Sequence, residues 1–246
     1  MDESALDALP YLDEDLYTDG VLQRPTCNSC SRPLTVCVCH VICKNLTVKT
    51  HVLILQHPAE QKRQLRTVPL LKSSLPDDKC SVLVGKKFKD LESSISKKSV
   101  LLFPGKDAMK CNQVPENTFD MLICLDGTWP QARRMYQKNQ ILHSLPKIMI
   151  NSPRKSVYLI HTQPTNFHLS TLESVAYAIQ EMENLDGFED RLIAPLKEMV
   201  RIQFKFGACA HSTQQEAKTM RKQEIKNGSK NLTVAPKLIN FDYESF

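Results

Sequence analysis

The stretch MLICLDGTWPQARRMY, residues 121–136, contains the pattern that decides the fold. Its apolar run MLICL does not alternate with polar residues, which is typical of a strand buried on both faces of a parallel sheet. The run ends at the carboxylate of Asp126, and the only tryptophan of the chain, Trp129, follows in the next turn. The pattern predicts a buried strand, a tight turn and a helix start, with an acid at the junction.

Other segments repeat this arrangement. The runs KTHVLILQHP (residues 49–58), SVLLFPG (99–105) and KIMIN (147–151) are apolar and end at proline, glycine or asparagine. Helical patterns lie between or after them, in PQARRMYQKNQIL (130–142) and in STLESVAYAIQEMENL (170–185), where apolar residues recur every three to four positions. We therefore predict an α/β fold, a mostly parallel sheet with helices on both faces.

Three of the predicted strands end in the loops HPAE, FPG and DGTW. The carboxyl ends of parallel strands lie at one edge of a sheet, and the ligand crevice of such a sheet lies outside that edge. We therefore expect the three loops to meet there, with Asp126 in a crevice.

Asp126 has two interpretations. It could cap a helix that begins near Pro130 by accepting backbone N–H bonds, and Thr128 is another candidate for that cap. Alternatively, burial would favour the neutral form of its carboxyl group and suit it to act as a general base. Trp129 at a crevice wall would give adenine or another base a surface to stack on. The spacing alone leaves both interpretations open.

Four cysteines lie within the segment CNSCSRPLTVCVC: Cys27, Cys30, Cys37 and Cys39. Four thiolates this close together predict a tetrahedral zinc site, and a closed four-sulfur site is structural rather than catalytic. A set of buried free thiols is the alternative. Because the C-x-C pair is tighter than the usual C-x2-C, His40 or Cys43 could replace one ligand.

Two further motifs have a structural and a functional interpretation. STLE, residues 170–173, fits the capping box S-x-x-E at the start of a periodic helix, and capping alone is enough to explain it. HPAEQKRQLRT, residues 57–67, places Glu60, Arg63 and Arg66 after a predicted strand. These three charges form either an anion site or a solvated helix face.

The charge of the chain is uneven. Residues 1–23 contain seven acids and no Lys or Arg, whereas the whole chain has 32 Lys and Arg against 27 Asp and Glu, so the remainder is strongly basic. Residues 127–172 contain six Lys and Arg and no acid. This stretch is either a nucleic-acid surface or a solvated basic face.

Several classes of protein are disfavoured. The sequence has no G-x-G-x-x-G and no P-loop, which argues against Rossmann-type dinucleotide binding and Walker-type hydrolysis. Its acidic N-terminus and the lack of an apolar run of about 20 residues predict neither a signal peptide nor a membrane span. Nine cysteines without secretory features indicate a reducing compartment, the cytoplasm or the nucleus.

In this order, the segments CNSCSRPLTVCVC, LILQHPAE, LLFPG, LDGTWPQARRM and STLESVAYAI resemble the DTW-domain family, and in particular its tRNA-uridine aminocarboxypropyltransferases. The resemblance implies a SPOUT-like, knotted α/β fold, S-adenosylmethionine as donor and tRNA as partner, with no DNA or membrane involved. The 3-amino-3-carboxypropyl group would pass to uridine N3 and methylthioadenosine would leave. The rivals are a SPOUT-like RNA methyltransferase, a ribosomal RNA aminocarboxypropyltransferase and a non-catalytic zinc-knuckle RNA-binding protein.

The resemblance also implies the residues of the site. The D-x-T-W signature would be catalytic: Asp126, Thr128 and Trp129. Asp126 and Trp129 would also touch the donor, together with the other signature positions: Pro104, Gly105, Ser170, Thr171 and Glu173. The acid-free stretch would supply the RNA contacts: Arg133, Arg134, Lys138, Arg154 and Lys155. The expected organisation is an acidic flexible arm (1–23), a zinc knuckle (24–45), a catalytic domain (46–210) and a polar Lys-rich tail (211–246).

Overall fold

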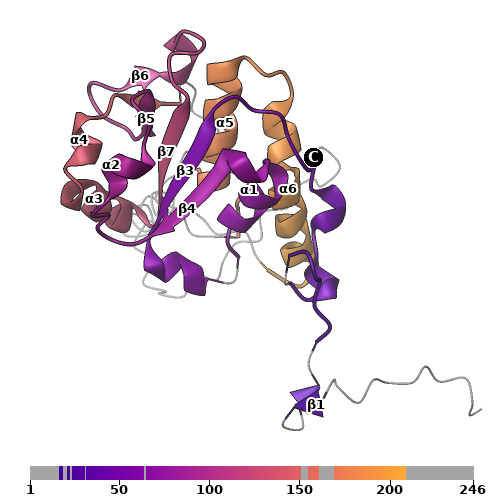
Figure 1. Ribbon diagram of the computed structural model, residues 1–246. Helices are drawn as coiled ribbons and strands as arrows, with labels where there is room; N and C mark the ends of the chain where they lie inside the picture. Colours follow the sequence, from indigo (N-terminus) through magenta and orange to yellow (C-terminus); the bar gives the residue numbers. More distant parts are fainter. Residues whose placement is uncertain are drawn as a thin grey trace, which may run out of the picture.

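The centre of the protein is a six-stranded sheet in the order β4-β3-β7-β5-β8-β6, in which every neighbouring pair is parallel (Figure 1). The structure is a computed structural model that describes residues 17–18, 21–22, 24–30, 32–63, 65–150, 155–160 and 169–208. The strands are β3 (His51–Gln56), β4 (Cys80–Val84), β5 (Ser99–Leu102), β6 (Met109–Lys110), β7 (Met121–Asp126) and β8 (Lys147–Met149). The predicted α/β class with a mostly parallel sheet is confirmed.

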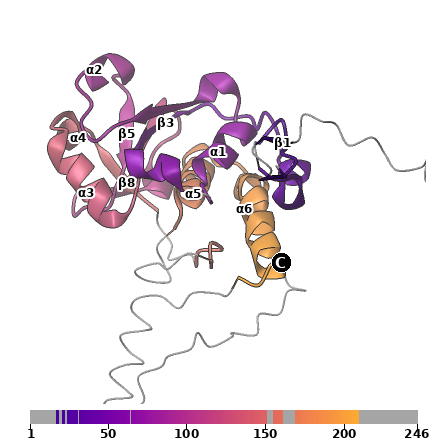
Figure 2. The same ribbon diagram turned by 90° about the horizontal axis from the view of Figure 1, so that it is seen from below.

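Helices cover both faces of the sheet (Figures 1 and 2). They are α1 (Val68–Ser74), α2 (Leu91–Ser94), α3 (Trp129–Lys138), α4 (Ile141–Ser144), α5 (Thr171–Glu183) and α6 (Phe188–Lys205). Alternate residues of β3 point to opposite faces, as the period of a strand requires. Val52 and Ile54 join the core formed with α1, α5 and α6, whereas Leu53 and Leu55 join the core formed with α2, α3 and α4.

Short 3-10 helices connect these elements: Leu34–Val36, Cys39–Val41, Pro58–Lys62, Asp77–Lys79 and Cys111–Gln113. Of the expected acidic arm, the structure describes only a two-stranded antiparallel pair, β1 (Tyr17–Thr18) and β2 (Val21–Leu22). The expected tail at 211–246 lies outside the described residues. No helix in the described part of the chain has both the length and the apolar character that crossing a membrane would need.

One predicted helix is wrong in its extent. The segment 130–142 forms α3 and the separate short helix α4, because Asn139 interrupts the run. The Asn139 side chain is buried and donates to the carbonyl oxygen of Met135, at 2.6 Å, while its own oxygen accepts the backbone N–H of Phe88 at 2.8 Å. A tertiary contact therefore ends the helix, and the local pattern could not reveal it. Of the sheet strands and α-helices, β4, β6, α1, α2 and α6 lie outside the sequence predictions.

Candidate active site

Asp126 is the last residue of β7, and it lies beside Gln56, the last residue of β3, in the parallel register. Its side chain is 7% exposed. One carboxylate oxygen accepts a hydrogen bond from Gln56 Nε2 at 2.8 Å, and the other accepts one from the Thr171 hydroxyl at 2.5 Å. Two side chains from distant parts of the chain therefore fix both oxygens of one buried carboxylate at the carboxyl edge of the sheet.

The turn after Asp126 explains the rest of the D-G-T-W order. Thr128 is the N-cap of α3 and forms a capping box with Gln131, whose side-chain oxygen accepts the Thr128 backbone N–H at 2.8 Å. A Cβ atom at Gly127 would lie 3.2 Å from Gln131 Cβ and 3.3 Å from His57 Cβ, so a glycine allows the close packing of this turn. Thr128, and not Asp126, caps the helix, so the capping interpretation of Asp126 is wrong.

Trp129 forms an aromatic wall together with the end of β5. Its ring centroid lies 6.1 Å from that of Phe103, with the planes tilted by 54°, and Phe103 stacks on Tyr136 at 4.7 Å. Phe103 directly precedes Pro104 and Gly105, which are both exposed. The half-buried indole therefore stands where the loops after β5 and β7 meet, as the sequence predicted for those two loops.

The start of α5 supplies the third side of the site. Ser170 caps this helix and forms a capping box with Glu173, so the structural interpretation of STLE is confirmed. Glu173 is completely buried and accepts hydrogen bonds from the Ser156 hydroxyl at 2.9 Å and from the backbone N–H groups of Val157 and Ser170, each at 2.7 Å. With no exposed surface it cannot touch a donor in this structure, which corrects its expected role to a positioning one. It anchors the helix start that carries Thr171.

A second carboxylate lies close to Asp126. Glu60, in the 3-10 helix after β3, is 9% exposed. One of its oxygens forms an ion pair with Arg63 Nε at 3.2 Å, whereas the other is buried and has no hydrogen-bond partner among the described residues. Burial raises the pKa of Glu60; Arg63 opposes this shift and the nearby charge of Asp126 adds to it. Glu60 therefore brings an unsatisfied carboxylate oxygen to the same edge.

The same loop contributes His57. Its backbone N–H donates to the backbone oxygen of Asp126 at 2.8 Å, which continues the pairing of β3 with β7 past the strand end. Its ring nitrogen Nδ1 accepts the N–H of Ala59 at 3.2 Å. Burial and the positive charge of Lys86 lower the pKa of His57, so the neutral imidazole is favoured and does not add a cation beside Asp126.

The four cysteines of the predicted knuckle come together. Their sulfur atoms all lie within 4.8 Å of one another, with 3.7 Å between Cys27 and Cys39 and 3.8 Å between Cys30 and Cys37. A tetrahedral zinc with Zn–S bonds of about 2.3 Å holds its sulfurs about 3.8 Å apart, so the thiols fit that ion. His40 instead faces Glu198 of α6 at 3.5 Å, and Cys43 packs against the core. Neither belongs to this cluster.

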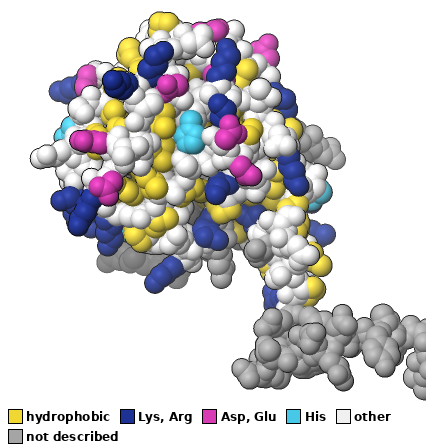
Figure 3. Space-filling view, in the orientation of Figure 1, with side chains coloured by type: hydrophobic (Ala, Val, Ile, Leu, Met, Phe, Trp, Pro, Cys, Tyr) yellow, Lys and Arg dark blue, Asp and Glu magenta, His cyan; other side chains and the backbone are white. Residues whose placement is uncertain are grey.

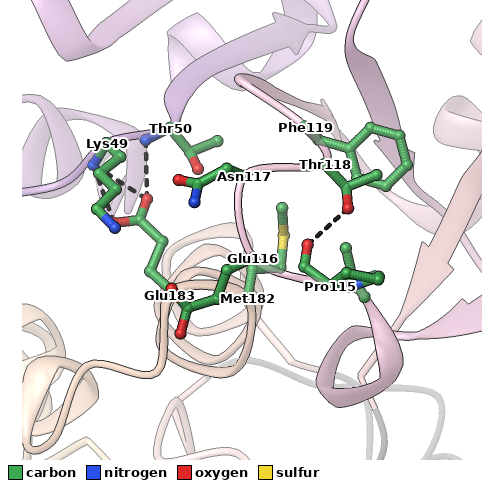
Figure 4. Close-up of a pocket in the computed structure, with 10 residues that line it drawn as sticks. Lys49, Thr50, Pro115, Glu116, Asn117, Thr118, Phe119, Met182 and Glu183 are labelled. Atoms are coloured by element: carbon green, nitrogen blue, oxygen red, sulfur yellow. Dashed lines mark hydrogen bonds between the residues drawn. The ribbon is translucent and has the colours of Figure 1, made fainter.

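A different pocket lies at the opposite, amino edge of the sheet (Figure 4). Glu183, at the end of α5, points into it and accepts the backbone N–H of Lys49 at 2.9 Å and that of Thr50 at 2.8 Å. Thr118 in the same pocket donates to the carbonyl oxygen of Pro115 at 2.6 Å. Glu183 and Thr118 are therefore satisfied within the protein, and Glu183 joins α5 to the segment before β3.

A family model for the DTW domain matches residues 24–204. The chain belongs to the DTW domain family. The sequence-based recognition of the family is therefore confirmed. The DTW domain includes the cysteine knuckle, the whole six-stranded sheet and nearly all of α6.

Named relatives of this DTW domain come from animals and plants. The chain is 34% identical over 224 residues to "tRNA-uridine aminocarboxypropyltransferase 2" of Macaca fascicularis, which covers 87% of this chain and 73% of that protein. It is 35% identical over 209 residues to the protein of the same name in Drosophila melanogaster, with coverages of 81% and 83%. "tRNA-uridine aminocarboxypropyltransferase A" of Arabidopsis thaliana is 26% identical over 225 residues, with coverages of 76% and 84%. No solved structure shows a significant match.

The expected RNA-binding residues of the DTW domain lie on and beyond α3. Arg133, Arg134 and Lys138 are exposed on this helix, and the Arg133 guanidinium lies 6.0 Å from the centre of the Trp129 ring. Lys155 is also exposed, whereas Arg154 lies outside the described residues. The three α3 side chains therefore extend a basic surface away from the aromatic wall.

Sequence reasoning missed two groups of the site. Gln56 belongs to no recognised motif, although it is a polar residue at the end of an otherwise apolar strand, in register with Asp126. In the sequence, Glu60 is one of three charges with Arg63 and Arg66, and the pattern gives it no separate role. Their position in the sequence is a signal for both: Gln56 ends β3, which neighbours β7, and Glu60 lies in the 3-10 helix that follows β3.

Proposed function

We propose that this protein is a tRNA-uridine aminocarboxypropyltransferase that moves the 3-amino-3-carboxypropyl group of S-adenosylmethionine to N3 of a uridine in tRNA. The names of its relatives support this activity. The observation that carries the mechanism is the buried, doubly held carboxylate of Asp126 beside Trp129 at the carboxyl edge of the sheet. Many free cysteines without secretory features are typical of a protein from a reducing compartment, which favours the cytoplasm or the nucleus.

Asp126 would act as the general base. Its carboxylate removes the proton from uridine N3, and the freed electron pair forms a bond to the γ-carbon of the donor's methionine part. The bond between that carbon and the sulfonium breaks, its electrons return to sulfur, and neutral methylthioadenosine leaves. Each carboxylate oxygen accepts more than one hydrogen bond, so Gln56 and Thr171 can hold Asp126 while one lone pair still faces the uracil.

Orientation would provide much of the acceleration, because a sulfonium is already a good leaving group. The site must present the γ-carbon to N3 and keep the methyl group away, and such positioning can lower a barrier by ~7–11 kcal/mol. Trp129 and Phe103 would pack against the adenine or the target base, next to the exposed Pro104 and Gly105. Backbone N–H groups at the starts of α3 and α5 suit the donor's carboxylate or the uracil oxygens.

Glu60 would receive the positive end of the donor. A buried carboxylate oxygen without a partner is costly, and a bound cation removes that cost. S-adenosylmethionine carries an ammonium group and a sulfonium, whereas uridine carries no cation. We therefore assign Glu60 to donor binding and Asp126 to proton removal.

Zinc would have a structural role here. Four thiolates would hold the ion and tie the knuckle to α6, where Arg32 Nη2 lies 4.0 Å from Met199 Sδ. Elemental analysis of the purified protein should find about one zinc per chain, and the double variant C27S/C30S should lose it. A metal-free wild type that keeps its melting temperature would contradict this role.

The activity is tested with the full-length protein, a tRNA transcript and S-adenosylmethionine labelled either in the aminocarboxypropyl chain or in the methyl group. Mass spectrometry of the nucleosides should find only the chain label on uridine, with one methylthioadenosine released per transfer. Methyl label in the RNA with S-adenosylhomocysteine would identify a methyltransferase instead. Faster transfer to a ribosomal RNA fragment than to tRNA would identify ribosomal RNA as the substrate. Binding of tRNA without binding of the donor would indicate a non-catalytic RNA-binding protein.

A further inference from the structure

The loop that follows β4 is rich in lysine and lies outside every motif discussed so far. It contains the sequence KKFK at residues 86–89, named here the lysine loop. Lys86, Lys87 and Lys89 are exposed, and Phe88 is half-buried against the core below α3. Three cations thus surround one apolar anchor.

The lysine loop starts at the candidate active site. The backbone N–H of Gly85 donates to the carbonyl oxygen of Gln56 at 2.9 Å, and Gln56 holds Asp126. The charge of Lys86 contributes to the lowered pKa of His57, which follows Gln56. The first lysine therefore lies within electrostatic reach of the crevice.

The other end of the loop is held at the end of α3. The buried Asn139 accepts the backbone N–H of Phe88 at 2.8 Å and donates to the carbonyl oxygens of Lys86 at 3.3 Å and Met135 at 2.6 Å. One side chain thus satisfies backbone groups of both segments. The lysines lie on a fixed backbone and not on a free loop, so less conformational entropy is lost when a ligand binds.

An open groove lies between the lysine loop and the end of α3. Its lining includes Lys87, Lys89 and Lys138, with Glu92 as the acid on its wall. No ion pair among the described residues involves these three lysines. In Figure 3, Lys and Arg side chains gather at the corner where Figure 1 shows α3 and the end of β4. The groove therefore carries three lysines against one acid, and none of these lysines is held in an ion pair within the described part of the chain.

The distance from the groove to the candidate active site fits a short stretch of RNA strand. α3 has 10 residues, so at 1.5 Å per residue the groove end of the helix lies about 15 Å from the end that carries Trp129. That length spans about four stacked nucleotides at 3.4 Å each. Exposed Arg133 and Arg134 lie between the two ends.

We propose that the lysine loop and the end of α3 form a phosphate-binding groove for the tRNA backbone, which leads the target uridine to the crevice at Asp126. The proposal rests on the proposed function and adds the surface that positions the tRNA strand. Lysine side chains of this kind bind phosphates without reading bases, so they fix position and not sequence.

The test uses the full-length double variant K87E/K89E and a matched control, K97E/K98E. Lys97 and Lys98 are also exposed and adjacent, but they precede β5 at the opposite, amino edge of the sheet. Both variants change the net charge equally. The measurements are the affinity for a tRNA transcript over a range of salt concentrations, the affinity for S-adenosylmethionine by calorimetry, and the transfer rate at saturating tRNA.

We expect K87E/K89E to weaken tRNA binding at least tenfold and to reduce the slope of log affinity against log salt by about 1 for each phosphate that the variant no longer neutralises. Donor affinity and the rate at saturating tRNA should stay at the wild-type level, and the control should bind tRNA within about twofold of wild type. Equal effects of the two variants would overturn the groove while leaving the enzyme activity intact. A wild type that binds no tRNA would overturn the groove and the proposed function together.

Discussion

The two edges of the sheet each hold a carboxylate, but the groups that satisfy the two carboxylates differ. At the amino edge, Glu183 accepts backbone N–H groups of Lys49 and Thr50. At the carboxyl edge, Asp126 accepts bonds only from side chains in the described part of the chain, those of Gln56 and Thr171. Backbone partners join segments of the fold, whereas side-chain partners orient a group beside a crevice. The comparison separates a structural acid from a candidate catalytic one.

The largest expected effect is the loss of transfer in D126N. Asparagine keeps the size of the side chain but cannot take a proton, so the rate at saturating substrates should fall about 10²–10⁴-fold, the usual contribution of a general base. Donor and tRNA affinities and the melting temperature should change little. The measurement is single-turnover transfer to a tRNA transcript, with calorimetry for the two ligands. Transfer by D126N at the wild-type rate would show that Asp126 is not a catalytic residue.

The amino edge should respond in the opposite way. E183A removes the acceptor of the N–H groups of Lys49 and Thr50, which should lower the free energy of unfolding by about 1–3 kcal/mol. Transfer by the folded variant should match that of wild type. Urea denaturation followed by circular dichroism measures the first quantity and single-turnover kinetics the second. A folded E183A with greatly reduced transfer would show that the amino edge also takes part in the reaction.

The smallest of the expected effects concerns Glu60. E60Q should weaken S-adenosylmethionine binding about tenfold, because a neutral amide replaces the buried carboxylate that meets the cation, and the rate at saturating donor should change less. Burial raises the pKa of Glu60, so its protonated form persists to higher pH than in an ordinary glutamate. A proton and the donor's cation compete for this group. Wild-type donor affinity should therefore rise with pH through the raised pKa.

Calorimetry with S-adenosylmethionine across this pH range measures that dependence. The same titration of E60Q should be flatter, since glutamine does not ionise. Identical pH profiles for the two proteins would remove Glu60 from donor binding and leave Asp126 as the only assigned acid of the crevice.

Local patterns predicted the strands β3, β5, β7 and β8 and the cap at Ser170, because those features depend on neighbouring residues. The apolar run before Asp126 and the S-x-x-E box at Ser170 are both of this kind. The partners of Asp126 depend on the sheet order instead: Gln56 lies 70 positions away and Thr171 lies 45 positions away. Only the placement of β3 beside β7 brings Gln56 into register.

The same distinction explains the errors at α3 and Glu173. The end of α3 is set by the contact of Asn139 with the lysine loop, which lies about 50 positions earlier and leaves no mark in the helical pattern. Glu173 was correctly placed in a capping box, but its bonds to Ser156 and Val157 bury it completely. A motif identifies the cap, and only the packing shows that the acid has no surface left for a ligand.

The pH dependence of transfer by D126N tests the central claim most directly. If Asp126 removes the N3 proton, D126N can react only with uridine that has already lost this proton to water. The fraction of that anion grows with pH, so the single-turnover rate of D126N should rise about tenfold per pH unit towards the wild-type rate. The wild-type rate should stay nearly level over the same alkaline range. A D126N rate that stays low and independent of pH, with both substrates bound, would contradict proton removal by Asp126.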